Sequence, residues 1–151
     1  MPIPGRFGDT SKSPYVESVI SIESQFPRLL PSDISFLVDT GASVTTIAPN
    51  DGCRIGVDYG ALKNQQGISG IGGEARAYLE PAILCFGGSS KIYVYQLPIL
   101  FLEPLEEYMQ YPSLLGRDIL SKWKMVYSPQ ENHLSFEVKV SDSSFPYPSG
   151  A

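Results

Sequence analysis

The chain contains Phe36-Leu37-Val38-Asp39-Thr40-Gly41-Ala42-Ser43, an apolar run that ends on a carboxylate. Branched and aromatic residues in such a run favour a β-strand. Gly41 permits a tight turn whose N–H faces the carboxylate, and Thr40 can hydrogen-bond the loop without adding bulk. The stretch therefore predicts a strand whose end presents Asp39 from a fixed loop. On these residues alone, the alternative is a strand that ends in an ordinary Asx-type turn.

A glycine-rich segment follows further along the chain and reads Gly67-Ile68-Ser69-Gly70-Ile71-Gly72-Gly73. Its glycines permit the positive φ values of a hairpin tip, and such a hairpin can open and close over a bound molecule. The alternatives are an ordinary glycine-rich hairpin and a phosphate-binding loop. The phosphate loop is disfavoured because its G-x-G-x-x-G pattern requires a glycine where Ala75 stands.

A third segment, Ser113-Leu114-Leu115-Gly116-Arg117-Asp118-Ile119-Leu120, is by itself a buried strand that meets the start of a helix. The order and separation of all three segments are more specific than any one of them. Together they resemble the retropepsin-like family of aspartic peptidases, over most of residues 15–140.

The resemblance implies a role for each segment. The expected site residues are a catalytic Asp39; the loop supports Thr40, Gly41 and Ser43; the flap residues Ser69, Gly70, Ile71, Gly72 and Gly73; and, crossing behind the active site, Leu115, Gly116, Arg117 and Asp118. Retroviral members carry an acid at the position of Ser43, so the ion pair that this acid makes with the arginine does not transfer to Arg117. We expect Asp118 to cap the helix start rather than to act as a second catalytic acid.

The reaction implied is hydrolysis of peptide bonds by two carboxylates that share one proton. The chain has one Asp-Thr-Gly, and its 151 residues are too few for two lobes that each carry the motif. A second Asp39 must then come from a second copy, which predicts a homodimer with an extended polypeptide as substrate. The alternatives are a catalytically inactive peptide-binding module of the same fold and a structural dimerisation domain.

Composition favours strands, with 9 Tyr and 7 Phe among 42% hydrophobic residues. We predict an all-β, retropepsin-like closed barrel with a flap hairpin and one short C-terminal helix, assembled as a two-fold symmetric homodimer. The expected strands are 15–22, 35–38, 75–79, 82–86, 92–97, 125–127 and 134–138, the last two joined as a hairpin, and helical turns are expected at 58–63 and 117–124.

Residues 15–140 are expected to form the protease domain, between flexible tails at 1–14 and 141–151 that are rich in Ser, Pro and Gly. A net charge of −5 without a Lys/Arg cluster disfavours nucleic acid as a partner. No apolar run reaches the length of a membrane span, so we expect no membrane contact.

Cys53 and Cys85 are interpreted as free thiols in a reducing, cytoplasmic compartment, with a single disulfide as the alternative. Their spacing fits no metal site, and we expect neither metal nor cofactor. The only histidine is His133, in a predicted turn, which disfavours a serine or cysteine nucleophile.

Overall fold

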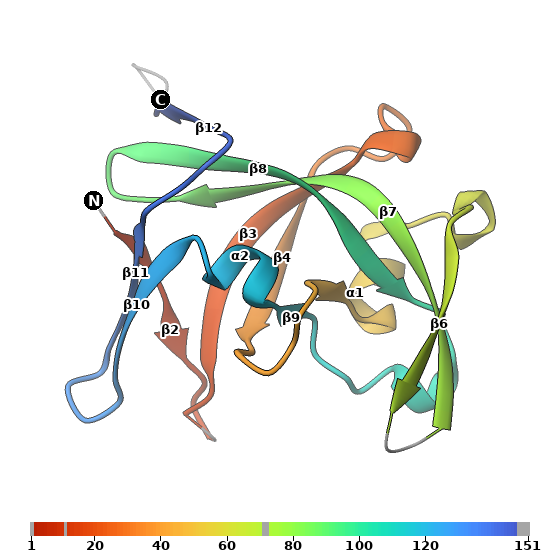
Figure 1. Cartoon of the computed structure of the whole chain (residues 1–151), viewed down its shortest axis with the longest axis horizontal. Helices are drawn as coiled ribbons and strands as arrows, with labels where there is room; N and C mark the ends of the chain where they lie inside the picture. The colour runs from red at the N-terminus through yellow and green to blue at the C-terminus, as the bar shows by residue number, and fades with distance from the viewer. Residues whose placement is uncertain (1, 11, 71–72, 148–151) are drawn as a thin grey trace.

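The structure is a computed structural model that describes residues 2–10, 12–70 and 73–147 (Figure 1). Strands dominate it, and they are β1 (Ile3–Pro4), β2 (Arg6–Phe7), β3 (Pro14–Ile22), β4 (Ser32–Val38), β5 (Thr46–Ile47), β6 (Gln65–Gly70), β7 (Gly73–Gly87), β8 (Lys91–Leu102), β9 (Leu114–Leu115), β10 (Trp123–Ser128), β11 (His133–Val138) and β12 (Ser143–Pro146). The helices are short, namely α1 (Pro49–Ile55), α2 (Arg117–Leu120) and the 3-10 turns η1 (Glu23–Gln25), η2 (Tyr59–Ala61) and η3 (Glu106–Tyr108). The predicted all-β class is confirmed.

The large sheet closes on itself as a six-stranded barrel. Its strands follow the order β12-β8-β5-β9-β4-β3-β7-β6, and an additional pairing of β7 with β8 completes the ring. A second sheet, ordered β1-β11-β10, packs at one end of the barrel. The predicted closed barrel and the predicted β10–β11 hairpin are therefore both confirmed.

Strand β4, which ends at the residue before Asp39, and its neighbour β3 follow the two-residue period of a half-buried sheet. Alternate side chains point into the barrel, and these are Val16, Ser18, Ile20 and Ile22 from β3 and Ile34, Phe36 and Val38 from β4. Because this inward series ends at Val38, the next residue, Asp39, leaves the core where the strand ends.

An aromatic cluster joins the second sheet to the barrel. Trp123 at the start of β10 packs edge-on against Phe86 and Tyr95, with ring centroids 4.8 Å and 6.2 Å away, and tilted against Phe136. Its indole Nε1 donates to the Tyr95 hydroxyl at 2.8 Å, and that hydroxyl donates to the carbonyl of Val140 at 2.7 Å. Burial raises the pKa of Tyr95, so its hydroxyl keeps the proton that it donates.

Several sequence predictions differ from the structure. The runs 75–79 and 82–86 are one strand, β7, because Glu80 and Pro81 continue the pairing with β8. The helix expected over 117–124 ends at Leu120, since Trp123 is drawn into the aromatic cluster and begins β10. The turn expected at 58–63 is the 3-10 turn η2. Helix α1 was not predicted, although it begins with Pro49 and its C-cap is Gly56 with φ 92°, both regular signals of helix boundaries.

The ranges expected to be flexible tails contain strands over their described residues. β1 pairs with β11, and Ile3 is 1% exposed. β2 pairs with β3, and β12 pairs with β8. Backbone pairing and the burial of one apolar side chain place strands within these ranges, which composition alone did not indicate. Among the described residues, no helix is long and apolar enough to span a membrane.

Replacing Tyr95 by Phe tests the link between the two sheets. The variant leaves the buried Trp123 N–H without its acceptor, so we expect the free energy of unfolding to fall by about 1–3 kcal/mol. Denaturant titration followed by Trp123 fluorescence measures it. Tyr111→Phe is the control because Tyr111 is 54% exposed; equal stability of the two variants would contradict the argument.

Candidate active site

Asp39 is held by backbone groups on both sides of its turn. Its own N–H donates to the carbonyl of Leu115 at 3.0 Å, and the N–H of Gly41 donates to its Oδ1 at 2.9 Å. The N–H of Ala42 closes the turn on the Asp39 carbonyl at 3.2 Å. The side chain is half-buried, whereas Thr40, Gly41 and Ser43 are exposed. A carboxylate fixed in this way can face a second group without first being ordered.

The segment containing β9 lies directly behind the loop. β9 runs parallel to β4, with Leu114 opposite Leu37 and Leu115 opposite Val38. Leu115 is fully buried, and Ser113 contributes its carbonyl to the N–H of Leu37 at 2.8 Å. The strand that carries Asp39 is therefore supported by the segment that the family resemblance indicated.

Gly116 allows this segment to touch the loop. A Cβ at Gly116 would lie 2.8 Å from the carbonyl carbon of Val44 and 3.0 Å from both the Ala42 oxygen and the Thr45 nitrogen. These neighbours are backbone atoms, which cannot rotate away as the end of a side chain can. The position thus requires glycine for space rather than for an unusual φ.

Arg117 binds the loop through two donors. Its N–H donates to the Ala42 carbonyl at 2.8 Å, and its Nη1 donates to the Thr40 carbonyl at 2.9 Å. The sequence did not indicate what the guanidinium contacts in the absence of an acid at Ser43. In this chain its hydrogen-bond partner is the Thr40 carbonyl.

The Asp118 carboxylate ties α2 to the other end of the loop. Its Oδ2 accepts from the N–H of Thr45 at 2.8 Å, and its Oδ1 accepts from the Thr45 hydroxyl at 2.6 Å and from the N–H of Ile119 at 2.9 Å. Thr45 also accepts from the N–H of Gly116 at 3.1 Å and is fully buried. The N-cap residue itself is Gly116, so Asp118 joins the first turn to the loop instead of being the N-cap. Sequence reasoning missed Thr45.

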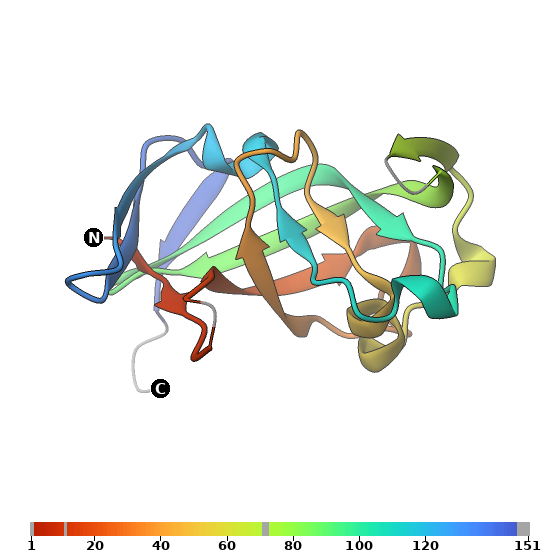
Figure 2. The same ribbon diagram turned by 90° about the horizontal axis from the view of Figure 1, so that it is seen from below.

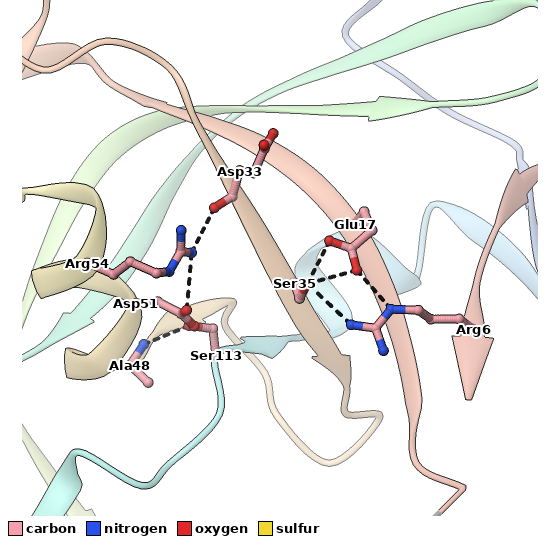
Figure 3. A network of polar contacts seen from close by, with 8 residues as sticks. All are labelled: Arg6, Glu17, Asp33, Ser35, Ala48, Asp51, Arg54 and Ser113. Atoms are coloured by element: carbon pink, nitrogen blue, oxygen red, sulfur yellow. Dashed lines mark hydrogen bonds and ion pairs between the residues drawn. The ribbon is translucent and has the colours of Figure 1, made fainter. Parts of the chain in front are cut away.

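A polar network fixes α1 against the barrel (Figure 3). The fully buried Ser113 accepts from the N–H of Ala48 at 2.9 Å and donates to Asp51 at 2.6 Å. Arg54 reaches Asp51 at 3.3 Å and the Asp33 carbonyl at 2.8 Å. The network thereby joins α1 to β4 and to the residue before β9.

A second, exposed group of side chains links β2, β3 and the middle of β4 (Figure 3). Arg6 on β2 pairs with Glu17 on β3 at 3.0 Å, and Ser35 on β4 donates to the same carboxylate at 2.6 Å. Such exposed pairs contribute little stability. These contacts join side chains of three paired strands, and we do not assign a functional site to them.

The glycine-rich segment forms a hairpin of β6 and β7. Ser69 lies opposite Glu74, and Gly70 lies opposite Gly73, at the end of the ladder. Ile71 and Gly72, which we also assigned to the flap, lie outside the described residues. In both views the 39–45 loop lies between this hairpin and the β10–β11 hairpin (Figures 1 and 2).

The other candidate groups lie outside the loop. His133 bonds the hydroxyl of Ser135 at 3.1 Å within β11. Cys53 in α1 and Cys85 in β7 are free thiols, and burial raises the pKa of Cys85. Within the described ranges, no group of three His, Cys, Asp or Glu residues is placed to hold a metal ion.

Replacing Gly116 by Ala is expected to push the loop away from β9. Overpacking of this kind costs about 1–3 kcal/mol of unfolding free energy. Gly67→Ala is the matched control because a Cβ there meets nothing within 4 Å. Urea unfolding of both variants measures the difference, and a Gly116→Ala protein as stable as the control would refute the close approach.

The sequence of the chain matches a known protein family. Residues 32–122, more than half of the chain, match the family model described as "gag-polyprotein putative aspartyl protease". No curated protein sequence matches the chain.

Two solved structures share the fold. The retropepsin-like aspartic protease from Rickettsia conorii superposes with a TM-score of 0.54 at 18% identity, over 89% of this chain and 96% of its own. The EIAV protease, solved in complex with the inhibitor HBY-793, superposes with a TM-score of 0.50 at 21% identity, over 76% of this chain and 90% of its own. The chain therefore belongs to the gag-polyprotein aspartyl protease family and has the retropepsin-like fold.

Proposed function

We propose that this protein is an aspartic endopeptidase that works as a homodimer, with Asp39 of each copy supplying one carboxylate. The observation that carries the proposal is the fixed, half-buried Asp39 at the end of β4, held by the N–H of Gly41 and the carbonyl of Leu115 in a member of an aspartyl protease family. The chain offers one such acid, so a complete site needs a second copy.

The chemistry follows from two carboxylates in close contact. Two carboxyl groups at short range cannot both ionise, because their negative charges would repel each other. The pair therefore holds one proton and titrates as a unit. The ionised member takes a proton from water while the protonated member polarises the peptide carbonyl. Because Oδ1 already accepts from the Gly41 N–H, the side chain keeps one orientation through this exchange.

The remaining residues position the acid and the substrate in this proposal. Thr40, Gly41 and Ser43 shape the loop, and the segment from Leu115 to Asp118 holds it from behind. The β6–β7 hairpin, with Ser69, Gly70, Ile71, Gly72 and Gly73, serves as the flap. An extended polypeptide between flap and loop would be bound through its main chain, as an added strand is. No nucleic acid or membrane takes part.

The two thiols support a reducing location. Cys53 is exposed and free, and Cys85 is free as well. Unpaired cysteines of this kind persist in the cytoplasm, whereas oxidising compartments favour disulfides. We therefore infer a cytoplasmic location for this enzyme.

Asp39→Asn tests the catalytic assignment. The amide keeps the oxygen that accepts from Gly41 but cannot serve as the base, so cleavage should fall by at least about 100-fold. The measurement is digestion of a diverse peptide mixture, analysed by mass spectrometry from acidic to neutral pH. Asp9→Asn, at an exposed turn residue, is the control. A native protein that binds peptides and yields no products would instead support the inactive binding module.

Mixing the native and Asp39→Asn proteins tests whether the dyad spans two copies. At fixed native concentration, added variant should lower cleavage in proportion to the mixed dimers that form, because each of these has a single ionisable Asp39. The readout is initial rate against variant concentration, with Asp9→Asn as the added protein in the control. An unchanged rate despite demonstrated subunit exchange would show that one chain is sufficient.

A further inference from the structure

The two strands of the β6–β7 hairpin are attached to the barrel in different ways. β7 is part of the barrel, since it pairs with β8 from Ala77 to Gly87, and the N–H of Glu103 donates to the carbonyl of Arg76 at 3.0 Å. Within the described part of the chain, β6 pairs with β7 alone and ends its sheet. Its first three residues, 65–67, are exposed. The hairpin therefore extends past the end of β8 with only one of its strands anchored by a second neighbour (Figure 1).

A buried carboxylate holds the chain where β6 begins. Glu80 is 4% exposed, and its Oε1 accepts from the N–H of Lys63 at 2.7 Å and from the N–H of Asn64 at 3.2 Å. These two residues come directly before Gln65, the first residue of β6. The N–H of Leu79 donates to the carbonyl of Asn64 at 2.9 Å and closes the base of the hairpin. The weakly attached strand thus starts from a point that one side chain holds.

Glu80 is itself fixed to the barrel. It lies in β7 opposite Ile99 of β8, and the Ile99 side chain is fully buried. A buried carboxylate requires hydrogen bonds in place of water, and bonds to a charged group are stronger than neutral ones. Lys63 and Asn64 are both exposed. Their backbone is therefore held by Glu80 and not by burial of their own side chains.

A second buried polar side chain holds the same segment further from the hairpin. Gln25 is 3% exposed; its Nε2 donates to the carbonyl of Asp58 at 2.8 Å, and its Oε1 accepts from the N–H of Asp58 at 3.0 Å. The turn η2 separates Asp58 from the residues that Glu80 contacts. Both side chains make two hydrogen bonds to the backbone, but only Glu80 acts at the start of β6. Gln25 therefore offers a matched control.

We propose that Glu80 is the pivot of the flap, because its carboxylate fixes the backbone from which β6 swings. The inference rests on the proposed function, in which the β6–β7 hairpin closes over a bound peptide. Glu80 contacts no reacting atom, so it is a positioning residue. A loosened base gives the hairpin more arrangements in which it does not face the 39–45 loop. Since apparent affinity is proportional to the fraction of molecules that can bind, loss of the pivot weakens substrate binding more than it slows the chemical step.

Glu80→Leu tests the inference through steady-state kinetics on a cleaved peptide. Leucine removes both hydrogen bonds with a side chain of similar size, whereas Glu80→Gln keeps an Oε1 that can accept from both N–H groups. We expect the KM of Glu80→Leu to rise at least about fivefold with kcat changed less than about twofold, and Glu80→Gln to restore the native KM within about twofold. Gln25→Leu should leave KM unchanged.

Hydrogen exchange follows the pivot independently of activity. The amides of β6 should exchange at least about tenfold faster in Glu80→Leu than in the native protein, while those of β11 keep their native rates. Gln25→Leu should leave exchange in β6 unchanged. If Glu80→Leu does not fold, Glu80→Asp takes its place in both measurements, because its carboxylate is one methylene shorter and cannot reach both N–H groups.

The outcomes separate this inference from the proposed activity. Native exchange in β6 and a native KM in the folded variant would overturn the pivot. A fall in kcat and in melting temperature without a change in KM would show that Glu80 only stabilises the fold. If Gln25→Leu loosens β6 equally, or Glu80→Gln restores nothing, the assignment to Glu80 Oε1 is wrong. If β6 loosens in Glu80→Leu alone while the native protein cleaves no peptide, the pivot stands and the proposed peptidase does not.

Discussion

The contact between Gly116 and the backbone of residues 42–45 is the constraint on which the rest of the site depends. Gly116 lies so close to the loop that a Cβ on it would meet three backbone atoms of residues 42, 44 and 45. β9 and the loop therefore cannot slide or tilt independently. The Asp39 N–H then reaches the Leu115 carbonyl, Arg117 reaches the carbonyls of residues 40 and 42, and Thr45 reaches Asp118. Each of these bonds requires the same close approach, so they form or break together.

These contacts explain how the loop is held without an acid at Ser43. An arginine that binds a carboxylate depends on the side chain at that position, whereas Arg117 binds main-chain carbonyls, which every residue type provides. Hydrogen bonds from a charged donor are stronger than neutral ones. Ser43 is exposed. The loop is therefore held through hydrogen bonds to its backbone carbonyls and does not need an acid at residue 43 for these contacts.

The parts that sequence predicted are those set by local chemistry. The end of β4 at Asp39, the hairpin around the glycines and the strand before Gly116 follow from strand period, turn residues and apolar runs. The hydrogen bond between Thr45 and Asp118 joins residues 73 positions apart, so no local sequence pattern predicts it. The strands at both termini were missed for a similar reason, because β1 and β12 form by pairing with distant strands rather than through their own composition. The truncated α2 shows tertiary packing of Trp123 overriding helix propensity.

One continuous stretch, residues 113–128, connects the positioning of the acid with the second sheet. It begins with buried Ser113, forms β9 behind the loop, turns through α2 and then anchors Trp123 among Phe86, Tyr95 and Phe136. β10 leaves that anchor directly. Because close-packed interiors transmit displacement rather than absorb it, Trp123 fixes the direction of β10 relative to Asp39. The aromatic cluster therefore joins the second sheet to the same segment that holds the Asp39 loop from behind.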